Sequence, residues 1–190
     1  METRIFDLIL IEDYHHTMSL FEETVNTGKN GMVNAIRKAE ERDKEQRHYI
    51  SIGTVRHLGD ECNLYLMEET PEDGIQMREY ALSAVKTPLY RAMHLALAAL
   101  EERLSVGDQA IVAIITDNNE ILHCEPDEVV MKRKVEELKS AGWIFTYRGI
   151  GMDVVNNAAY IGITDAMTYE STMEGLEDLF QSLRVRYETD

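Results

Sequence analysis

The segment AIVAIITD, residues 110–117, is the feature that most constrains how this chain can fold. Its first six residues are apolar, so neither side of an extended strand would be polar and both sides need burial. Such a strand is typical of the centre of a parallel sheet that has helices on both faces. The segment RIFDLILIED, residues 4–13, predicts a second buried strand. We therefore expect an α/β fold.

The chain between these two strands predicts a helix and a hairpin. Apolar or small residues recur every three or four positions from Ser19 to about Arg42, and Gly28 lies on that face. We expect Gly28 to allow close packing of the helix on the sheet. Residues 48–57 and 62–68 predict two strands whose link, LGDE, is too short for a helical crossover. An antiparallel edge hairpin strand is therefore expected in a mostly parallel sheet.

The second half of the chain continues to alternate between helices and strands. The predicted elements are a helix from Pro88 to Leu104, a helix that ends before Gly142, a strand at 143–151, a short helix running into a brief strand at 152–163, and a closing helix at 172–187. No repeat, linker or low-complexity segment interrupts them. The sequence thus predicts a single domain over residues 1–190, Rossmann-like and doubly wound, with helices on both faces of the sheet.

Charge and composition exclude several classes of partner. The 190 residues include 19 Lys and Arg and 35 Asp and Glu, a net charge of −16, which repels nucleic acid and anionic membrane surfaces. Cys62 and Cys124 lack the spacing of a zinc knuckle or a redox pair. The N-terminal segment is not a signal peptide, and no apolar run is long enough to span a membrane. We expect a soluble, cytoplasmic protein with reduced thiols.

Polar residues follow two of the predicted strands and begin one of the predicted helices. Asp13, His15 and Thr17 follow the first strand, Thr87 lies at the start of the helix that contains Pro88, and Asp117 ends the central strand. In doubly wound sheets, ligands bind outside the carboxyl ends of the strands. Oxygen and nitrogen donors that converge there would suit a divalent cation.

These residues resemble a known motif. The order DYHHTM, TPLYRAM and IITDNN resembles the von Willebrand factor A (vWA) domain family, whose metal-ion-dependent adhesion site (MIDAS) is written D-x-S-x-S-M, then a Thr, often in TPLY, then an Asp, often in TDG. The resemblance covers almost the whole chain. Asp13 corresponds to the first Asp, Thr17 to the second Ser, Thr87 to the Thr and Asp117 to the last Asp. His15 stands where the first Ser belongs, so the resemblance implies a degenerate MIDAS.

The resemblance also implies a function. In this family the metal keeps an open coordination position for a carboxylate of another protein, and the domain performs no bond chemistry. We therefore expect a non-enzymatic module whose protein partner docks through an acidic residue, with Tyr14, His16 and Asn118 as contact residues. The His15 imidazole is bulkier and softer than a hydroxyl, which leaves three alternatives: weak or no metal, Mg²⁺ or Mn²⁺ held by the other donors, or a transition metal such as Zn²⁺ with His15 as a ligand.

Plainer interpretations of the same residues remain open. Asp13 and Asp117 would also suit the capping of loops, and Thr17 would suit a helix N-cap. A structural vWA-like module without metal is a further alternative. No G-x-G-x-x-G or phosphate-binding loop follows the first strand, so a nucleotide-binding domain is not expected.

An enzymatic alternative is a phosphatase of the haloacid dehalogenase type. That family begins with D-x-D-x-[TV] after a strand, and DYHHT matches at the first and last positions. Thr116 would supply a phosphate-binding hydroxyl, and Lys134 or Asp153 would act as later partners. The second Asp, which would be the general acid, is replaced by His15.

Overall fold

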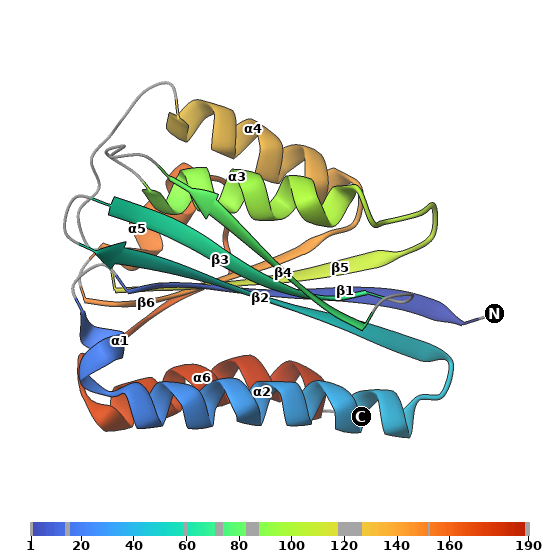
Figure 1. Cartoon of the computed structure of the whole chain (residues 1–190), viewed down its shortest axis with the longest axis horizontal. Coiled ribbons are helices and arrows are strands. Elements are labelled where there is room, and N and C mark those ends of the chain that lie inside the picture. The colour runs from blue at the N-terminus through green and yellow to red at the C-terminus, as the bar shows by residue number, and fades with distance from the viewer. Residues whose placement is uncertain are drawn as a thin grey trace.

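A seven-stranded mixed sheet lies between two layers of helices (Figure 1). The computed structural model describes residues 2–13, 16–58, 61–70, 74–82, 88–117, 127–151 and 153–188. The strands are β1 (Thr3–Asp13), β2 (Gln46–Leu58), β3 (Glu61–Thr70), β4 (Gly74–Ala81), β5 (Gln109–Thr116), β6 (Ile144–Ile150) and β7 (Ala166–Tyr169). The helices are α1 (Thr17–Leu20), α2 (Glu22–Arg42), α3 (Pro88–Glu101), α4 (Asp127–Ser140), α5 (Val154–Tyr160) and α6 (Met173–Glu188). Helices α3, α4 and α5 cover one face of the sheet, and α1, α2 and α6 cover the other (Figure 1).

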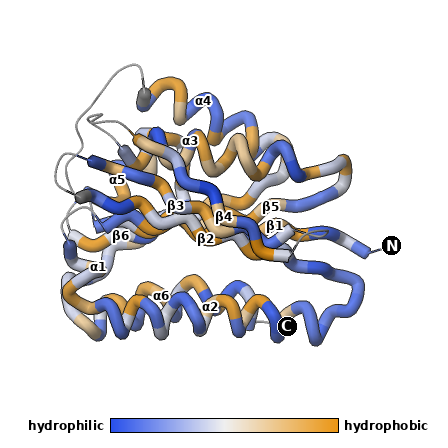
Figure 2. Tube along the Cα trace, viewed as in Figure 1, coloured by the Kyte–Doolittle hydropathy of each residue, from blue (hydrophilic) through white to orange (hydrophobic). Residues whose placement is uncertain are grey.

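The central strands are buried on both faces, as the sequence predicts. Strand order is β4-β3-β2-β1-β5-β6-β7, and β1 pairs in parallel with both β2 and β5. Alternate β1 side chains enter opposite cores, with Phe6, Leu8 and Leu10 on the α3 side and Ile9 and Ile11 on the α2 side. Hydrophobic and hydrophilic residues alternate along the helices (Figure 2). The α/β class, the mostly parallel sheet and the helices on both faces are confirmed.

The edges of the sheet contain two strands that differ from the prediction. The antiparallel hairpin of β2 and β3 is confirmed, but β4 extends the sheet by one further antiparallel strand, so β3 is not its edge. The brief strand predicted after α5 is wrong, because Ile161 and Ile163 are buried beside a turn at Gly162 and the strand, β7, begins only at Ala166. The sequence did not predict these two strands because neither contains a long apolar run. Strand β7 has only four residues, and the residues of β4 are exposed or half-exposed.

Gly28 packs a helix against a helix rather than against the sheet. A Cβ atom at Gly28 would lie 2.2 Å from Cδ2 of Phe180, a fully buried residue of α6. The prediction that Gly28 allows close packing of the helix on the sheet is therefore wrong, because its close neighbour belongs to α6. The small residue is required because the Phe180 ring occupies the space above the α2 backbone. Helices α2 and α6 lie side by side on the same face of the sheet (Figure 1).

A polar cluster is buried on the α2 and α6 side, toward the amino ends of the strands. The Asp7 carboxylate accepts hydrogen bonds from Nδ1 of His48 at 2.7 Å and from the Tyr187 hydroxyl at 2.7 Å. Burial raises the pKa of Asp7, and the hydrogen bond and charge of His48 oppose that rise. These three side chains link β1, β2 and α6.

None of the described helices combines the length and the apolar character needed to cross a bilayer.

Candidate functional site

The candidate site lies at the edge of the sheet where β1, β2 and β5 end. Asp13 is the last residue of β1, and Asp117 directly follows β5. Because these strands are parallel neighbours, their carboxyl ends lie at the same edge of the sheet. The short helix α1 begins at Thr17, just beyond the end of β1.

Both predicted carboxylates bind the amino end of α1. Asp13 accepts hydrogen bonds from the backbone N–H groups of Met18 at 2.9 Å and Ser19 at 3.1 Å, and from the Ser19 hydroxyl. Asp117 accepts one from the backbone N–H of Thr17 at 3.0 Å. Two segments distant in the sequence thus bring their carboxylates to three consecutive backbone N–H groups.

This arrangement satisfies a helix end that would otherwise lack partners. The first N–H groups of a helix have no acceptor within the helix. The N-cap residue of α1, His16, adopts a left-handed conformation with φ 59° and makes no side-chain capping hydrogen bond. Asp13 and Asp117 take over that role. The capping interpretation expected them to cap loops, and in the structure they cap a helix instead. Thr17 is the first helical residue and not the N-cap, so that alternative is wrong.

The remaining predicted site residues divide into exposed and undescribed positions. His16 is exposed at the entrance of the site. Tyr14, His15, Thr87 and Asn118 lie outside the described residues. The geometry therefore brings together three of the five predicted metal ligands, Asp13, Thr17 and Asp117.

The described donors are hard oxygen groups. Carboxylate and hydroxyl oxygens are ligands that Mg²⁺ and Mn²⁺ accept, so their chemistry is compatible with the predicted ion. Both oxygens of Asp13 already accept hydrogen bonds from α1. Within the described ranges, no group of three or more His, Cys, Asp or Glu residues has the arrangement needed to hold a metal.

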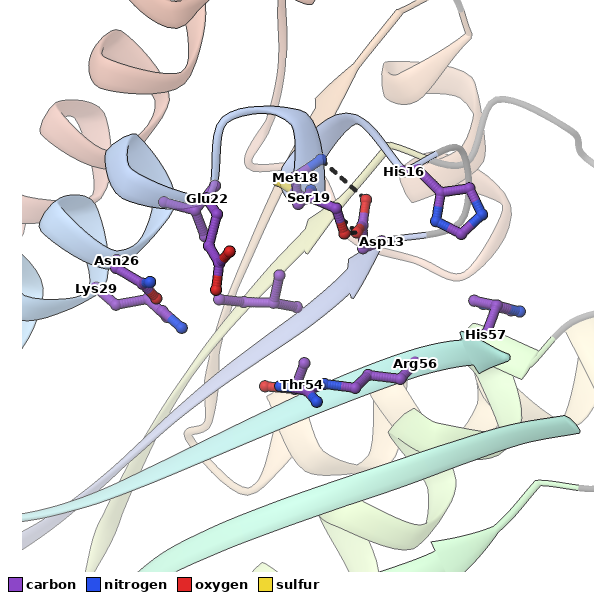
Figure 3. A pocket seen from close by; sticks show the side chains of 12 residues that line it. Asp13, His16, Met18, Ser19, Glu22, Asn26, Lys29, Thr54, Arg56 and His57 are labelled. Carbon is purple, nitrogen blue, oxygen red and sulfur yellow. Dashed lines mark hydrogen bonds between the residues drawn. The ribbon is translucent and has the colours of Figure 1, made fainter. Parts of the chain in front are cut away.

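A cavity of about 360 Å³ lies beside Asp13, between the start of α2 and the end of β2 (Figure 3). Asn26 and Lys29 of α2 face Thr54 and Arg56 of β2 across it (Figure 3). Asp13 is one of the residues that line this cavity. Sequence analysis did not single out Lys29 and Arg56, because nothing in their local pattern distinguishes them from other charged surface residues.

A second polar group lies on the other side of β1, toward α3. The Glu12 carboxylate is fully buried and accepts a hydrogen bond from the Thr116 hydroxyl at 2.8 Å. Nε2 of His57 lies 3.6 Å from Oε1 of Glu12 and 3.9 Å from Sγ of Cys62. Sequence analysis missed Glu12, although an acidic residue at the end of an otherwise apolar strand was a visible signal.

The residues proposed for a phosphatase have other partners. The Thr116 hydroxyl donates to Glu12, and Nζ of Lys134 on α4 lies 2.7 Å from Oε1 of Glu101 on α3. Asp153 is the N-cap of α5, with a left-handed φ of 64°. These contacts supply no observation in favour of phosphoryl chemistry.

No protein-family model and no curated protein matches this sequence. Among solved structures, the chain is similar to proximal thread matrix protein 1 from the mussel byssus, in its crystal form 2, with a TM-score of 0.57 and 13% sequence identity over 96% of this chain. This likeness shows the fold alone. The mussel protein has a vWA-like fold, which agrees with the fold class that the sequence predicts.

The match covers only part of the mussel protein. This chain spans about half of the mussel chain, 48% of its length. A second structure of the same mussel protein has a TM-score of 0.46 and 10% identity, over 98% of this chain and 47% of the other.

Cys62 should be an unreactive thiol. Burial, and after it the negative charge of Glu12, raise the pKa of Cys62 from 9.0 to about 11. A rise of this size lowers the thiolate fraction near neutral pH by about a hundredfold. Because the folded pKa is raised, the associated stability is complete below pH 9 and is lost as the pH rises toward about 11.

We expect iodoacetamide at about pH 8 to alkylate Cys62 at least about a hundredfold more slowly in the folded protein than in urea. Mass spectrometry of the digested protein would measure this rate for Cys62 alone. Equal rates in the folded and unfolded chains would contradict the buried, protonated thiol.

Proposed function

We propose that this chain is a non-enzymatic protein-interaction module whose partner docks at the carboxyl ends of β1, β2 and β5. The observation that carries the proposal is the convergence of Asp13 and Asp117 at the amino end of α1. Converging polar groups at this edge of an α/β sheet are the usual setting for a ligand site. Burying the Asp117 carboxylate, which is 1% exposed, also requires neighbouring donors or a cation.

A divalent metal is the proposed bridge to the partner. Asp13, Thr17 and Asp117, together with His15 and Thr87, would hold Mg²⁺ or Mn²⁺, or Zn²⁺ if His15 is a ligand. A carboxylate of the partner would complete the coordination shell. The cavity beside Asp13 would give the rest of the partner a place to bind.

Isothermal titration with Mg²⁺, Mn²⁺ and Zn²⁺ tests the metal part of this proposal. The wild-type protein should give a saturable heat with at least one ion, and Asp13→Ala should abolish it. Asp13→Ala also removes the cap of α1, at a cost of about 1 kcal/mol of stability, so thermal unfolding of the variant must be measured as well.

Ser19→Ala is the matched control. It removes the hydroxyl that donates to Asp13 and keeps both carboxylates, so metal binding should persist. Identical heats for the wild type and Asp13→Ala would remove the metal from the proposal. The partner would then have to bind this edge of the sheet directly.

A further inference from the structure

The helices leave one part of the sheet uncovered. Helices α2 and α6 pack on the central strands, but among the described residues their core includes no buried residue of β3 or β4. One row of apolar side chains crosses this open face, because Ile52 pairs with Met67 and Met67 pairs with Met77. Met77 is 64% exposed, and its neighbour on the same side of β4, Ile75, is 67% exposed. Large apolar side chains gathered on one exposed face are typical of interaction surfaces.

This open face is hollowed along its border with α2. A cavity of about 590 Å³ is lined by Ile52, Met67 and Met77 from the sheet and by Asn26 and Lys29 from α2. It shares four lining residues with the cavity beside Asp13, namely Asn26, Lys29, Thr54 and Arg56. The two cavities therefore form one continuous groove, here called the α2–β4 groove, which runs from the candidate site to the edge strand.

The middle of the α2–β4 groove is positively charged. Burial lowers the pKa of Lys29, and the positive charge of Arg56 lowers it further, so the two cations lie close enough to repel each other. Arg56 stacks over the Tyr65 ring, with 5.6 Å between its guanidinium carbon and the ring centroid. Across the described part of the chain, neither cation forms an ion pair within 4.0 Å, and the favourable charge of Glu22 has a smaller effect on the pKa of Lys29 than burial or Arg56.

Two neighbouring cations without close acidic partners are unexpected in a chain with a net charge of −16. Lys29 is partly desolvated by the groove, so an external carboxylate would interact with it more strongly than at an open surface. The repulsion between Lys29 and Arg56 would also be relieved. The apolar floor beside them disfavours a wholly polar polyanion such as nucleic acid.

We infer that the α2–β4 groove binds an acidic, apolar segment of the partner protein. In this arrangement, carboxylates of the segment face Lys29 and Arg56, and its large apolar side chains cover Met67 and Met77. The inference rests on the proposed function, because the groove opens at the site where the partner is proposed to dock. A second copy of this chain is the weaker candidate, because two copies of charge −16 repel each other.

Selection from a random peptide library displayed on phage tests this inference. Peptides enriched on the wild-type protein should combine Asp or Glu with Leu, Phe or Trp. A synthetic copy of the most enriched peptide should bind the wild type in isothermal titration. Lys29→Glu and Met77→Glu should each weaken its binding by at least about tenfold, because one reverses a cation and the other places a carboxylate in the apolar floor.

Two matched variants control for the change in net charge. Lys38→Glu makes the same change on an exposed position of α2 that does not line the groove, and Val106→Glu makes the same change at an exposed apolar residue elsewhere. Both should bind the peptide as the wild type does. Peptides without acidic residues, no enrichment, or equal binding by all variants would overturn the inference.

Other outcomes separate the groove from the proposed function. If Asp13→Ala abolishes peptide binding while Lys29→Glu and Met77→Glu do not, the inference that the groove binds the peptide is wrong. The proposal that the partner docks at the strand ends is then retained. If sedimentation shows a dimer that Met77→Glu dissociates, the occupant is a second copy and the inference is overturned. The titration with Mg²⁺, Mn²⁺ and Zn²⁺ tests whether the strand ends bind a metal, and its result does not depend on whether the groove binds a peptide.

Discussion

Replacing His48 by leucine should lower the free energy of unfolding by about 3 to 5 kcal/mol near neutral pH. His48 is 2% exposed and Asp7 is 1% exposed, so the substitution leaves a buried carboxylate that has lost His48 and keeps its hydrogen bond from Tyr187. Removing one partner of a buried pair costs far more than replacing both, because the remaining charge is desolvated without compensation. Urea denaturation followed by circular dichroism would measure the loss.

The loss should depend on pH in a defined direction. Burial raises the pKa of Asp7 above its ordinary value of 3.8, and His48 partly offsets that rise. Without His48, the pKa of Asp7 in the folded variant rises further. The variant therefore retains its stability below pH 3.8 and loses it as the pH rises through that folded pKa. The variant should therefore be closer to the wild type at about pH 4 than at about pH 7. An equal deficit at both pH values would mean that Asp7 carries no charge in the folded protein.

Two further variants isolate the cause. Tyr187→Phe removes one hydrogen bond to Asp7 and keeps His48, so its cost should be smaller, about 1.5 to 3 kcal/mol. The double variant Asp7→Leu with His48→Leu removes the charge together with its partner. It should be more stable than His48→Leu alone. A double variant that loses the sum of both single effects would contradict the unpaired-charge explanation.

Gly28→Ala should destabilise the protein, although alanine is the better helix former by about 1 kcal/mol. The added methyl group would lie 2.2 Å from the Phe180 ring, a rigid side chain that is 1% exposed and packed in the core. Overpacking of this kind costs about 1 to 3 kcal/mol, which exceeds the gain in helix propensity. Thermal and urea unfolding would measure the difference.

Gly31→Ala is the matched control on the same helix. Its methyl group would meet Nη1 of Arg184 at 2.7 Å, which is the far end of a flexible side chain that can turn aside. This variant should be neutral or more stable by up to about 1 kcal/mol. Gly28→Ala combined with Phe180→Leu should recover part of the loss, because leucine lacks the ring. Equal effects at both glycines would contradict the helix-to-helix contact.

The comparison of Gly28 with Gly31 also shows what a helical pattern does not specify. The repeat of apolar and small residues along residues 19–42 correctly predicts a helix with one buried face. It does not say which element covers that face. The partner, α6, is the last helix in the chain, and its position beside α2 follows from how the strands are ordered in the sheet.

For the candidate site too, the sequence shows which residues are acidic, and only the tertiary structure shows what they contact. Each of Asp13 and Asp117 is recognisable in the sequence as an acidic residue at the end of a buried strand. That both bind α1 depends on the parallel pairing of β1 with β5, which joins residues far apart in the chain. Lys29 and Arg56 become neighbours only because α2 packs beside β2. No local pattern carries that information.

The sequence by itself determined the α/β class, the buried central strands, most of the helices and the acidic residues at the strand ends. Those features depend on periodicity and on local chemistry, which a few neighbouring residues express. Only the tertiary structure decided that β4 forms the edge, that Phe180 lies over Gly28, that the two carboxylates bind α1, and that a groove joins Asp13 to Met77. Each of these depends on contacts between residues distant in the chain, whose energies arise only when the whole sheet and its helices are assembled.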